Sequence, residues 1–282
     1  TIFISFIFFL KIKNKNKNSN NFDILFLAFF SSLCVYFDHK FVIIPLYFLS
    51  NLLIEDKISL RKKFNLSLFY IVFSTPFMYL IYLWGNIIPV RDAGVRGTLQ
   101  TIHIENIGFS LTIIAFYLAP FLFLKKENIF FVFKNKIKNP NMYIFFIFLI
   151  IYVLMLINFN SIERVFLGNG IVYKFSIIIF GNFELSKIFL YLTFFISALI
   201  IYLYIDDIKD YLFIFYLIFS SILVTPLLQE YFDPLILILV LLFFNTKLYF
   251  NFTKLLFIYS YFFIFLLFAN LHYGLNIFSF FG

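Results

Sequence analysis

Long apolar runs separated by short polar stretches dominate this sequence. The apolar positions are consecutive, without the alternation of a membrane β-barrel strand, and a spanning helix needs about 20 mainly apolar residues. Segment 171–180 is short, and we expect it to lie along the membrane interface. The pattern predicts apolar helices at residues 1–10, 22–37, 41–54, 66–88, 107–124, 141–159, 188–205, 211–228, 232–244 and 255–271.

Composition supports the same interpretation. The 282 residues are 63% hydrophobic and 24% aromatic, and their mean hydropathy is +0.99. Only 13% are charged, against about 25% in soluble domains. A water-soluble fold could not cover so much apolar surface. We therefore predict an all-α fold, namely one polytopic transmembrane helical bundle over residues 1–282, with about 8–10 hydrophobic helices, some of them short or re-entrant.

Basic residues fall into three clusters, at 11–17, 57–63 and 125–138. The positive-inside rule assigns these loops to the cytoplasm. We attribute the net charge of +8 to this orientation, and not to nucleic-acid binding. The acidic loop Asp206–Asp210 also falls on the cytoplasmic side. The alternating path brings four chemically mixed clusters to the non-cytoplasmic side: Asp38-His39-Lys40, Arg91 to Glu105, Glu163-Arg164 and Gln229 to Asp233.

Residues 84–108 are the most unusual part of the chain. They hold the single Trp, four of the nine Gly and two of the four Arg, in a sequence that elsewhere prefers Lys. Arg91 and Arg96 could bind a phosphate or pyrophosphate in a bidentate manner. Asp92 or Glu105 could act as a base, and His103 could pair with a phosphate or a sugar hydroxyl. The alternative is an ordered external loop held by Arg–Asp pairs.

Two further clusters are candidate substrate-binding sites. One interrupts an apolar run between two short helices, and ionisable groups at membrane depth usually pair or line a polar cavity. The other lies between two prolines, which both disfavour regular helix. A hairpin turn with an ion pair and a polar helical turn are the plain alternatives. The residues are Asp38, His39 and Lys40 in the first cluster, and Gln229, Glu230 and Asp233 in the second.

Metal sites are not indicated by the sequence. Cys34 is the single cysteine, so a disulfide within the chain and a Cys-based metal site are excluded. It lies in an apolar segment. A zinc site is not expected in residues 84–108, because they contain one His and no Cys. The sequence implies no certain cofactor.

Several of these features together resemble the GT-C class of polytopic membrane glycosyltransferases. Short paired helices surround a charged tip, a helix ends in Trp-Gly-Asn, and an external loop with Asp, Gly and His follows. Within the class, the chain is most similar to the alpha-1,2-glucosyltransferases that use dolichyl-phosphate-glucose. The likeness covers roughly residues 22–245, and the order of residues departs from the family pattern. The counterparts here are Gly85-Asn86, Arg91-Asp92, His103 and Glu230-Tyr231-Phe232-Asp233-Pro234.

The resemblance implies a membrane transferase that moves a sugar from a polyprenyl-phosphate donor to a glycan, lipid or protein acceptor on the non-cytoplasmic face. Lys40, Arg91 and Arg96 could supply cations for the donor phosphate. The class usually carries its main catalytic acidic residue in the first external loop. We expect that loop to lie upstream, because the sequence starts without Met at Thr1, inside an apolar run too short to span. Some enzymes of the class use a divalent metal and others do not.

Two other functions stay open as alternatives. A transporter or flippase for lipid-linked saccharides usually carries repeats and broken helices at the membrane midplane. We find no internal repeat, and the predicted polar clusters lie at one face. A polysaccharide polymerase or ligase would have a large external loop, and the longest external stretch, residues 160–187, is short for one.

Overall fold

The structure is a computed structural model, and its regular elements are helices. It describes residues 1–15, 20–37, 39–56, 58–85, 103–127, 129–138, 141–157, 169–222, 227, 229, 232–233, 235–244, 246 and 248–274. In these residues the only strand-like pairing is an isolated bridge between Lys125 and Leu248. The predicted all-α class is therefore confirmed.

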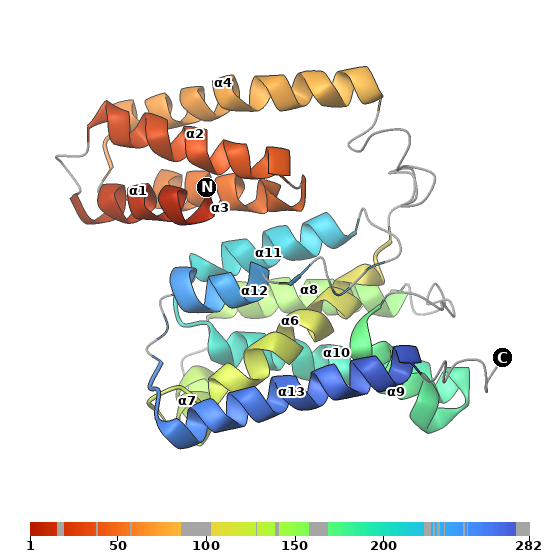
Figure 1. Ribbon diagram of the computed structural model, residues 1–282. Coiled ribbons are helices and arrows are strands. Elements are labelled where there is room, and N and C mark those ends of the chain that lie inside the picture. The colour runs from red at the N-terminus through yellow and green to blue at the C-terminus, as the bar shows by residue number, and fades with distance from the viewer. Residues whose placement is uncertain are drawn as a thin grey trace.

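The first part of the chain forms a layer of antiparallel helices, drawn from red to orange in Figure 1. Helix α1 continues through Lys11–Lys15, where the sequence predicted the start of a solvated loop, since lysine is a good helix former and Lys11 Nζ binds Asp23 Oδ1 at 2.6 Å. The elements are α1 (Ile2–Lys15), α2 (Asn21–Phe37), the 3-10 turn η1 (His39–Val42), α3 (Ile43–Ile54) and α4 (Leu60–Trp84).

The second part is built around α6, and it departs from the predicted helices in two places. The helix predicted at 211–228 ends at Ser221, and a short helix within 125–138 was not predicted. The elements are α6 (Asn106–Leu122), α7 (Ile129–Lys138), α8 (Met142–Ile157), α9 (Gly170–Phe180), α10 (Phe183–Tyr204), α11 (Asp210–Ser221), α12 (Leu235–Ile238), the π-helical turn η4 (Leu239–Phe243) and α13 (Phe252–Gly274).

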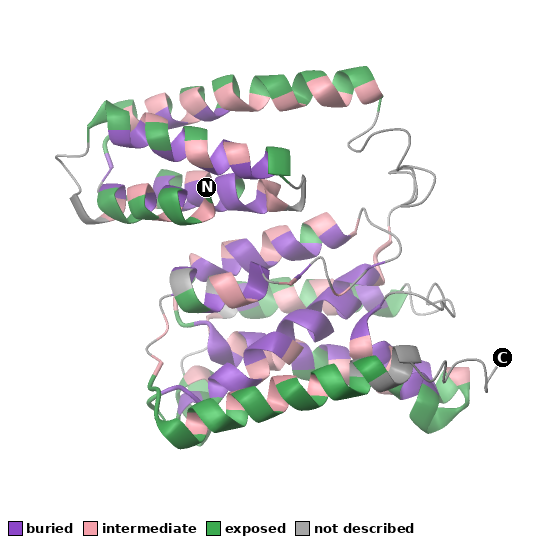
Figure 2. Cartoon of the chain, viewed as in Figure 1, coloured by how far each residue is buried: buried purple, intermediate pink, exposed green. Residues whose placement is uncertain are grey.

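Helix α6 is the centre of the second part and is buried along nearly its whole length (Figure 2). Phe109 meets the rings of Phe194 and Tyr173 edge-on, with centroids 5.4 and 5.5 Å apart. The preceding residue, Gly108, lies so close to α10 that a Cβ would come within 2.5 Å of the Phe194 ring. A glycine here therefore lets the two helices approach closely.

The two parts meet where α3 packs against α11. The Tyr47 ring lies edge-on to Phe213 with centroids 5.3 Å apart, and its hydroxyl donates to Asp210 Oδ1 at 3.2 Å. Nearby, Lys209 Nζ pairs with Glu55 Oε2 at 2.8 Å. An aromatic contact, a hydrogen bond and an ion pair thus join segments that lie more than 150 residues apart in the chain.

The helices run back and forth, so their ends gather at two ends of the molecule (Figure 1). One end, called here the lysine end, contains the end of α1, the start of α4, the end of α6, α7, the end of α10 and the start of α13. The described residues of the three predicted basic clusters all fall there. The opposite end contains the end of α4 and the starts of α6 and α10.

Helix lengths bear on the predicted number of spans. Two described helices, α4 and α10, are long and apolar enough to cross a membrane, and the pair α7 and α8, bent by 95°, would make a third span. Helices α2, α3, α9 and α11 have 17 residues or fewer, and the 17 residues of α6 rise only about 26 Å, against a hydrocarbon core of about 30 Å. Length alone therefore supports two or three spans.

Replacing Gly108 with valine should separate α6 from α10, because the new side chain would overlap the buried Phe194 ring. We expect the free energy of unfolding to fall by about 1–3 kcal/mol. The check is a lower thermal unfolding midpoint in detergent. Leu192→Val, at an exposed position of α10, is the matched control. A Gly108→Val midpoint equal to that of the control would contradict the close approach.

Candidate functional site

The start of α6 carries the first group of predicted site residues that the structure describes. His103 Nδ1 lies 3.1 Å from Glu105 Oε1, and both side chains are partly buried. The His103 amide donates to the Ile222 carbonyl at 3.0 Å, and Asn106 Nδ2 donates to the Ser221 carbonyl at 3.1 Å. The start of α6 is thus fixed to the end of α11. A carboxylate here also suits the positive end of the helix dipole.

Several residues of the predicted sites lie outside the described part of the chain. The segment between α4 and His103 lies outside the described residues, and so does part of the hairpin tip between α2 and α3. For two further residues the backbone is described in η1, but not the side chains. Outside the description are Asp38, Arg91, Asp92, Arg96, Glu163, Arg164 and Glu230, and the side chains of His39 and Lys40.

The second described group surrounds Tyr117, which lies in the second half of α6. Gln229 Nε2 donates to the Tyr117 hydroxyl at 3.1 Å. That hydroxyl also hydrogen-bonds the carboxylate of Asp233. Tyr117 itself is buried, whereas Gln229 and Asp233 are partly exposed. We call these three residues the Tyr117 cluster.

The Tyr117 cluster lies deeper than the sequence predicted. Two backbone bonds trace the path after α11: Ile222 accepts from His103, and Leu227 accepts from the Asn169 amide at 2.7 Å. Tyr117 follows the first residue of α6 by eleven positions, a rise of about 16 Å. Gln229 and Asp233 were expected on the same non-cytoplasmic side as Arg91 to Glu105. Instead Gln229 lies at Tyr117, in the second half of α6, and the helix that precedes it ends early, at Ser221.

The surroundings of the Tyr117 cluster are aromatic. The Phe262 ring of α13 stacks on Tyr117 with centroids 6.0 Å apart, and the Tyr261 hydroxyl donates to the Phe116 carbonyl at 3.1 Å. A carboxylate and an amide at this position can accept from and donate to hydroxyl groups of a ligand. The arrangement therefore suits a polar, uncharged group held inside an otherwise apolar bundle.

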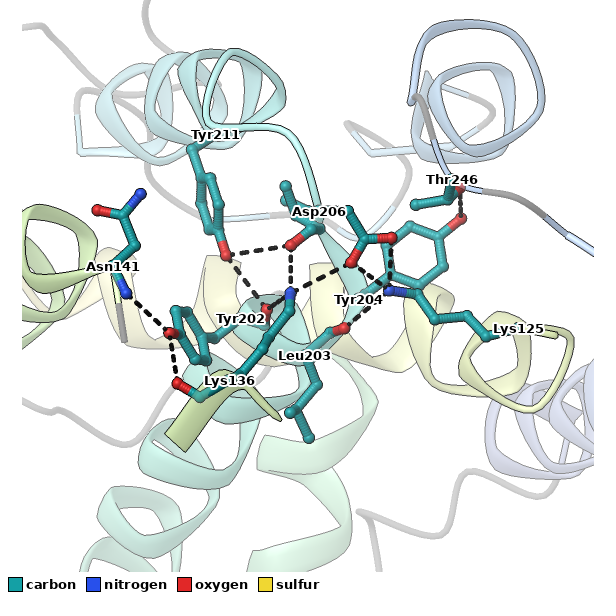
Figure 3. A network of polar contacts seen from close by, with 10 residues as sticks. Lys125, Lys136, Asn141, Tyr202, Leu203, Tyr204, Asp206, Tyr211 and Thr246 are labelled. Carbon is teal, nitrogen blue, oxygen red and sulfur yellow. Dashed lines mark hydrogen bonds and ion pairs between the residues drawn. The ribbon is translucent and has the colours of Figure 1, made fainter. Parts of the chain in front are cut away.

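A third polar group, at the lysine end, was not among the predicted sites (Figure 3). Asp206 accepts from Lys125 Nζ at 2.8 and 2.9 Å and pairs with Lys136 Nζ at 3.4 Å. Lys125 also donates to the Leu203 carbonyl, and Lys136 to the Tyr202 carbonyl. We call Lys125, Lys136 and Asp206 the lysine network. One feature of the sequence indicated this network, because the acidic loop Asp206–Asp210 and the basic cluster 125–138 were predicted on the same side.

Lys136 is affected by its burial and by both charged neighbours. Burial is the main cause that lowers the pKa of Lys136 to about 8; Asp206 opposes the shift and the nearby Lys125 adds to it. The carbonyls of Tyr202 and Ile205 both accept hydrogen bonds from Lys136 Nζ. The network thus ties the end of α10 to the end of α6 and to α7, as Figure 3 shows.

Comparison with known proteins adds no relative. The chain matches no family model, no curated protein and no solved structure. Among the residues that the structure describes, no three His, Cys, Asp or Glu side chains group as a metal site would require. The function is therefore argued from the geometry of the described clusters.

Replacing Tyr117 with phenylalanine should destabilise the protein, since it removes the hydroxyl that Gln229 and Asp233 share. Leaving buried polar groups without their partner costs about 1–3 kcal/mol. The check is the thermal unfolding midpoint in detergent, with Tyr82→Phe at an exposed position of α4 as the control. Equal midpoints for the two variants would mean that the cluster contributes nothing to stability.

Proposed function

We propose that the protein is a multi-pass membrane protein whose lysine end faces the cytoplasm. Helix α4 supports this, because it exposes Ile71, Met78 and Tyr82 by 64%, 61% and 79%. Water-soluble proteins rarely expose such contiguous apolar surface. The gathering of the described basic clusters at one end agrees with the positive-inside rule.

The short helices fit the same proposal. Helix α6 is surrounded by other helices, so its ends need not reach both membrane surfaces to satisfy its backbone. Irregular backbone is tolerated at membrane depth where it is buried in protein. Leu227 is buried and accepts from the Asn169 amide, and Gln229 donates to Tyr117 of α6.

For its activity, we propose transfer of a sugar from a polyprenyl-phosphate donor to an acceptor on the non-cytoplasmic face. The observation that carries this proposal is the Tyr117 cluster, in which a carboxylate and an amide are held inside an apolar bundle. Gln229 and Asp233 would bind sugar hydroxyls. Arg91 and Arg96, with Lys40, would neutralise the donor phosphate.

The proposed reaction is an inverting displacement. The acceptor oxygen forms a bond to the anomeric carbon while the bond from that carbon to the phosphate oxygen breaks. The polyprenyl phosphate leaves with the electron pair, and a carboxylate takes the acceptor proton. Asp92 and Glu105 are the candidates for this base within the chain, and the resemblance to GT-C enzymes implies a further acidic residue upstream. If the enzyme used a divalent metal ion, the ion would neutralise charge on the donor phosphate.

A transporter or flippase for lipid-linked saccharides is the second candidate, and one observation favours it. Irregular backbone with polar side chains at membrane depth is typical of transporter binding sites. Gln229 lies at Tyr117, in the second half of α6, rather than at one face. Such a protein would move the donor lipid between leaflets without forming a new bond.

The proposed orientation predicts which positions a membrane-impermeant maleimide reaches in intact cells. In a Cys34→Ser background, Glu184→Cys, exposed at the start of α10, should be labelled from outside. Lys126→Cys, exposed at the lysine end, should be labelled only after permeabilisation, because it faces the cytoplasm. Labelling of both positions from the same side would contradict the orientation.

The transferase proposal predicts that Asp233→Asn lowers sugar transfer by at least about tenfold, the value of one hydrogen bond to a charged group. Radiolabelled dolichyl-phosphate-glucose would be supplied to the protein in proteoliposomes with a membrane extract as acceptor source. Asp56→Asn, exposed between α3 and α4, is the control and should keep full transfer. Labelled lipid that crosses the bilayer without a new bond would favour the transporter instead, and the absence of both activities would contradict both candidates.

A further inference from the structure

An apolar groove opens between α8 and α10, with α6 as its floor. It has a volume of about 180 Å³ and is lined by Leu111, Phe148, Tyr152, Phe194, Ala198 and Tyr202, among others. The rim residues Phe145, Leu149 and Phe195 are 53%, 45% and 58% exposed. In the proposed orientation these rim residues face the bilayer, so the groove is open to lipid.

Two polar contacts hold the rims of the groove and set its length. At one end the Tyr191 hydroxyl donates to the Met155 carbonyl. At the other end the Asn141 amide donates to the Tyr202 hydroxyl at 3.2 Å. The helical rise between Asn141 and Met155 is about 21 Å. Between the two contacts, the small side chain of Ala198 leaves space along the α10 wall of the groove. When the groove is tilted, its length suits a single lipid chain within one leaflet, about 15 Å deep.

The groove ends beside cations at the lysine end. Tyr202, which lines the groove, accepts through its carbonyl from Lys136 Nζ at 2.6 Å, and its hydroxyl lies at Asn141 (Figure 3). The carboxylate of Asp206 offsets part of the charge of Lys125 and Lys136. Lys134 and Lys138 on α7 are exposed, and they add positive charge at the same end.

Helix α7 has the character of a helix that lies on a membrane surface. It is bent by 95° from α8, and it exposes Phe130 and Ile137 by 82% and 58% alongside its lysines. Short amphipathic helices with aromatic and basic residues bind the interface of anionic membranes. An apolar groove that ends at such a helix is complementary to an anionic amphiphile.

We propose that the groove holds one acyl chain of an anionic phospholipid of the cytoplasmic leaflet, with the lipid phosphate beside Lys134 and Lys138. The proposal rests on the membrane orientation argued above, but it needs no sugar transfer. The lipid would fill the gap between α8 and α10 and so stabilise the contact of both helices with α6. The site lies at the opposite end from His103 and Glu105, so it is separate from the proposed donor site.

Native mass spectrometry of the purified full chain, given equal amounts of phosphatidylglycerol and phosphatidylcholine, tests the headgroup part. We expect retention of phosphatidylglycerol over phosphatidylcholine. Lys134→Gln with Lys138→Gln should weaken phosphatidylglycerol binding by about fivefold for each lysine, the value of one basic residue near an anionic surface. Arg61→Gln with Lys62→Gln, at the same end on α4, is the charge-matched control and should leave binding unchanged.

A second variant tests the chain part. Ala198→Phe should fill the groove and reduce retention of both lipids alike, whereas Ile196→Phe, 52% exposed elsewhere on α10, should not. Equal retention of the two lipids by the unaltered protein, or unchanged binding in Ala198→Phe, would overturn the proposal. Displacement of the lipid by soluble glycerol 3-phosphate would also overturn it, because it would mean that the phosphate alone is bound. If the protein prefers phosphatidylglycerol but transfers no sugar, the result contradicts the proposed function and leaves the lipid site standing.

Discussion

The close packing of α6 against α10 is the contact on which the rest of the structure depends. Gly108 leaves room for the Phe194 ring, and Phe109 meets that ring edge-on. With α6 held in this position, its start meets the end of α11, and Tyr117 faces Gln229. The end of α6 leads to Lys125 and Asp206. The polar clusters are therefore spaced along one buried helix whose position a single glycine permits.

Polar groups inside this apolar bundle are paired across elements that are distant in the sequence. The carbonyls of Ser221, Ile222 and Leu227 each accept from residues of other segments, so these carbonyls are satisfied. An unpaired carbonyl in such surroundings would cost about 1–3 kcal/mol. The pairing thus fixes the end of α11 to the start of α6, and Leu227 to Asn169 before α9.

Sequence reasoning predicted the features that hydrophobic and basic patterns determine. The all-α class, the hairpin of α2 and α3, and the gathering of the described basic clusters at one end follow from those patterns. The end of α11 at Ser221 was missed, because residues 222–228 are nearly all apolar and only Pro226 signals a break. Asp206 and Lys125 are 81 positions apart, and their contact depends on the packing of α6 against α10, which no local pattern contains. The roles of Arg91, Asp92 and Arg96 stay predictions.

The depth of the Tyr117 cluster limits the kind of ligand that the protein could bind. The start of α6, with His103 and Glu105, and the Tyr117 cluster are separated by about 16 Å along the helix, whereas a hydrogen bond reaches about 3 Å. One small polar group could not contact both. A ligand that contacts both must be elongated, with one polar part at His103 and Glu105 and a second that reaches Gln229 and Asp233 beside Phe262 and Tyr261. A free monosaccharide is too short to contact both.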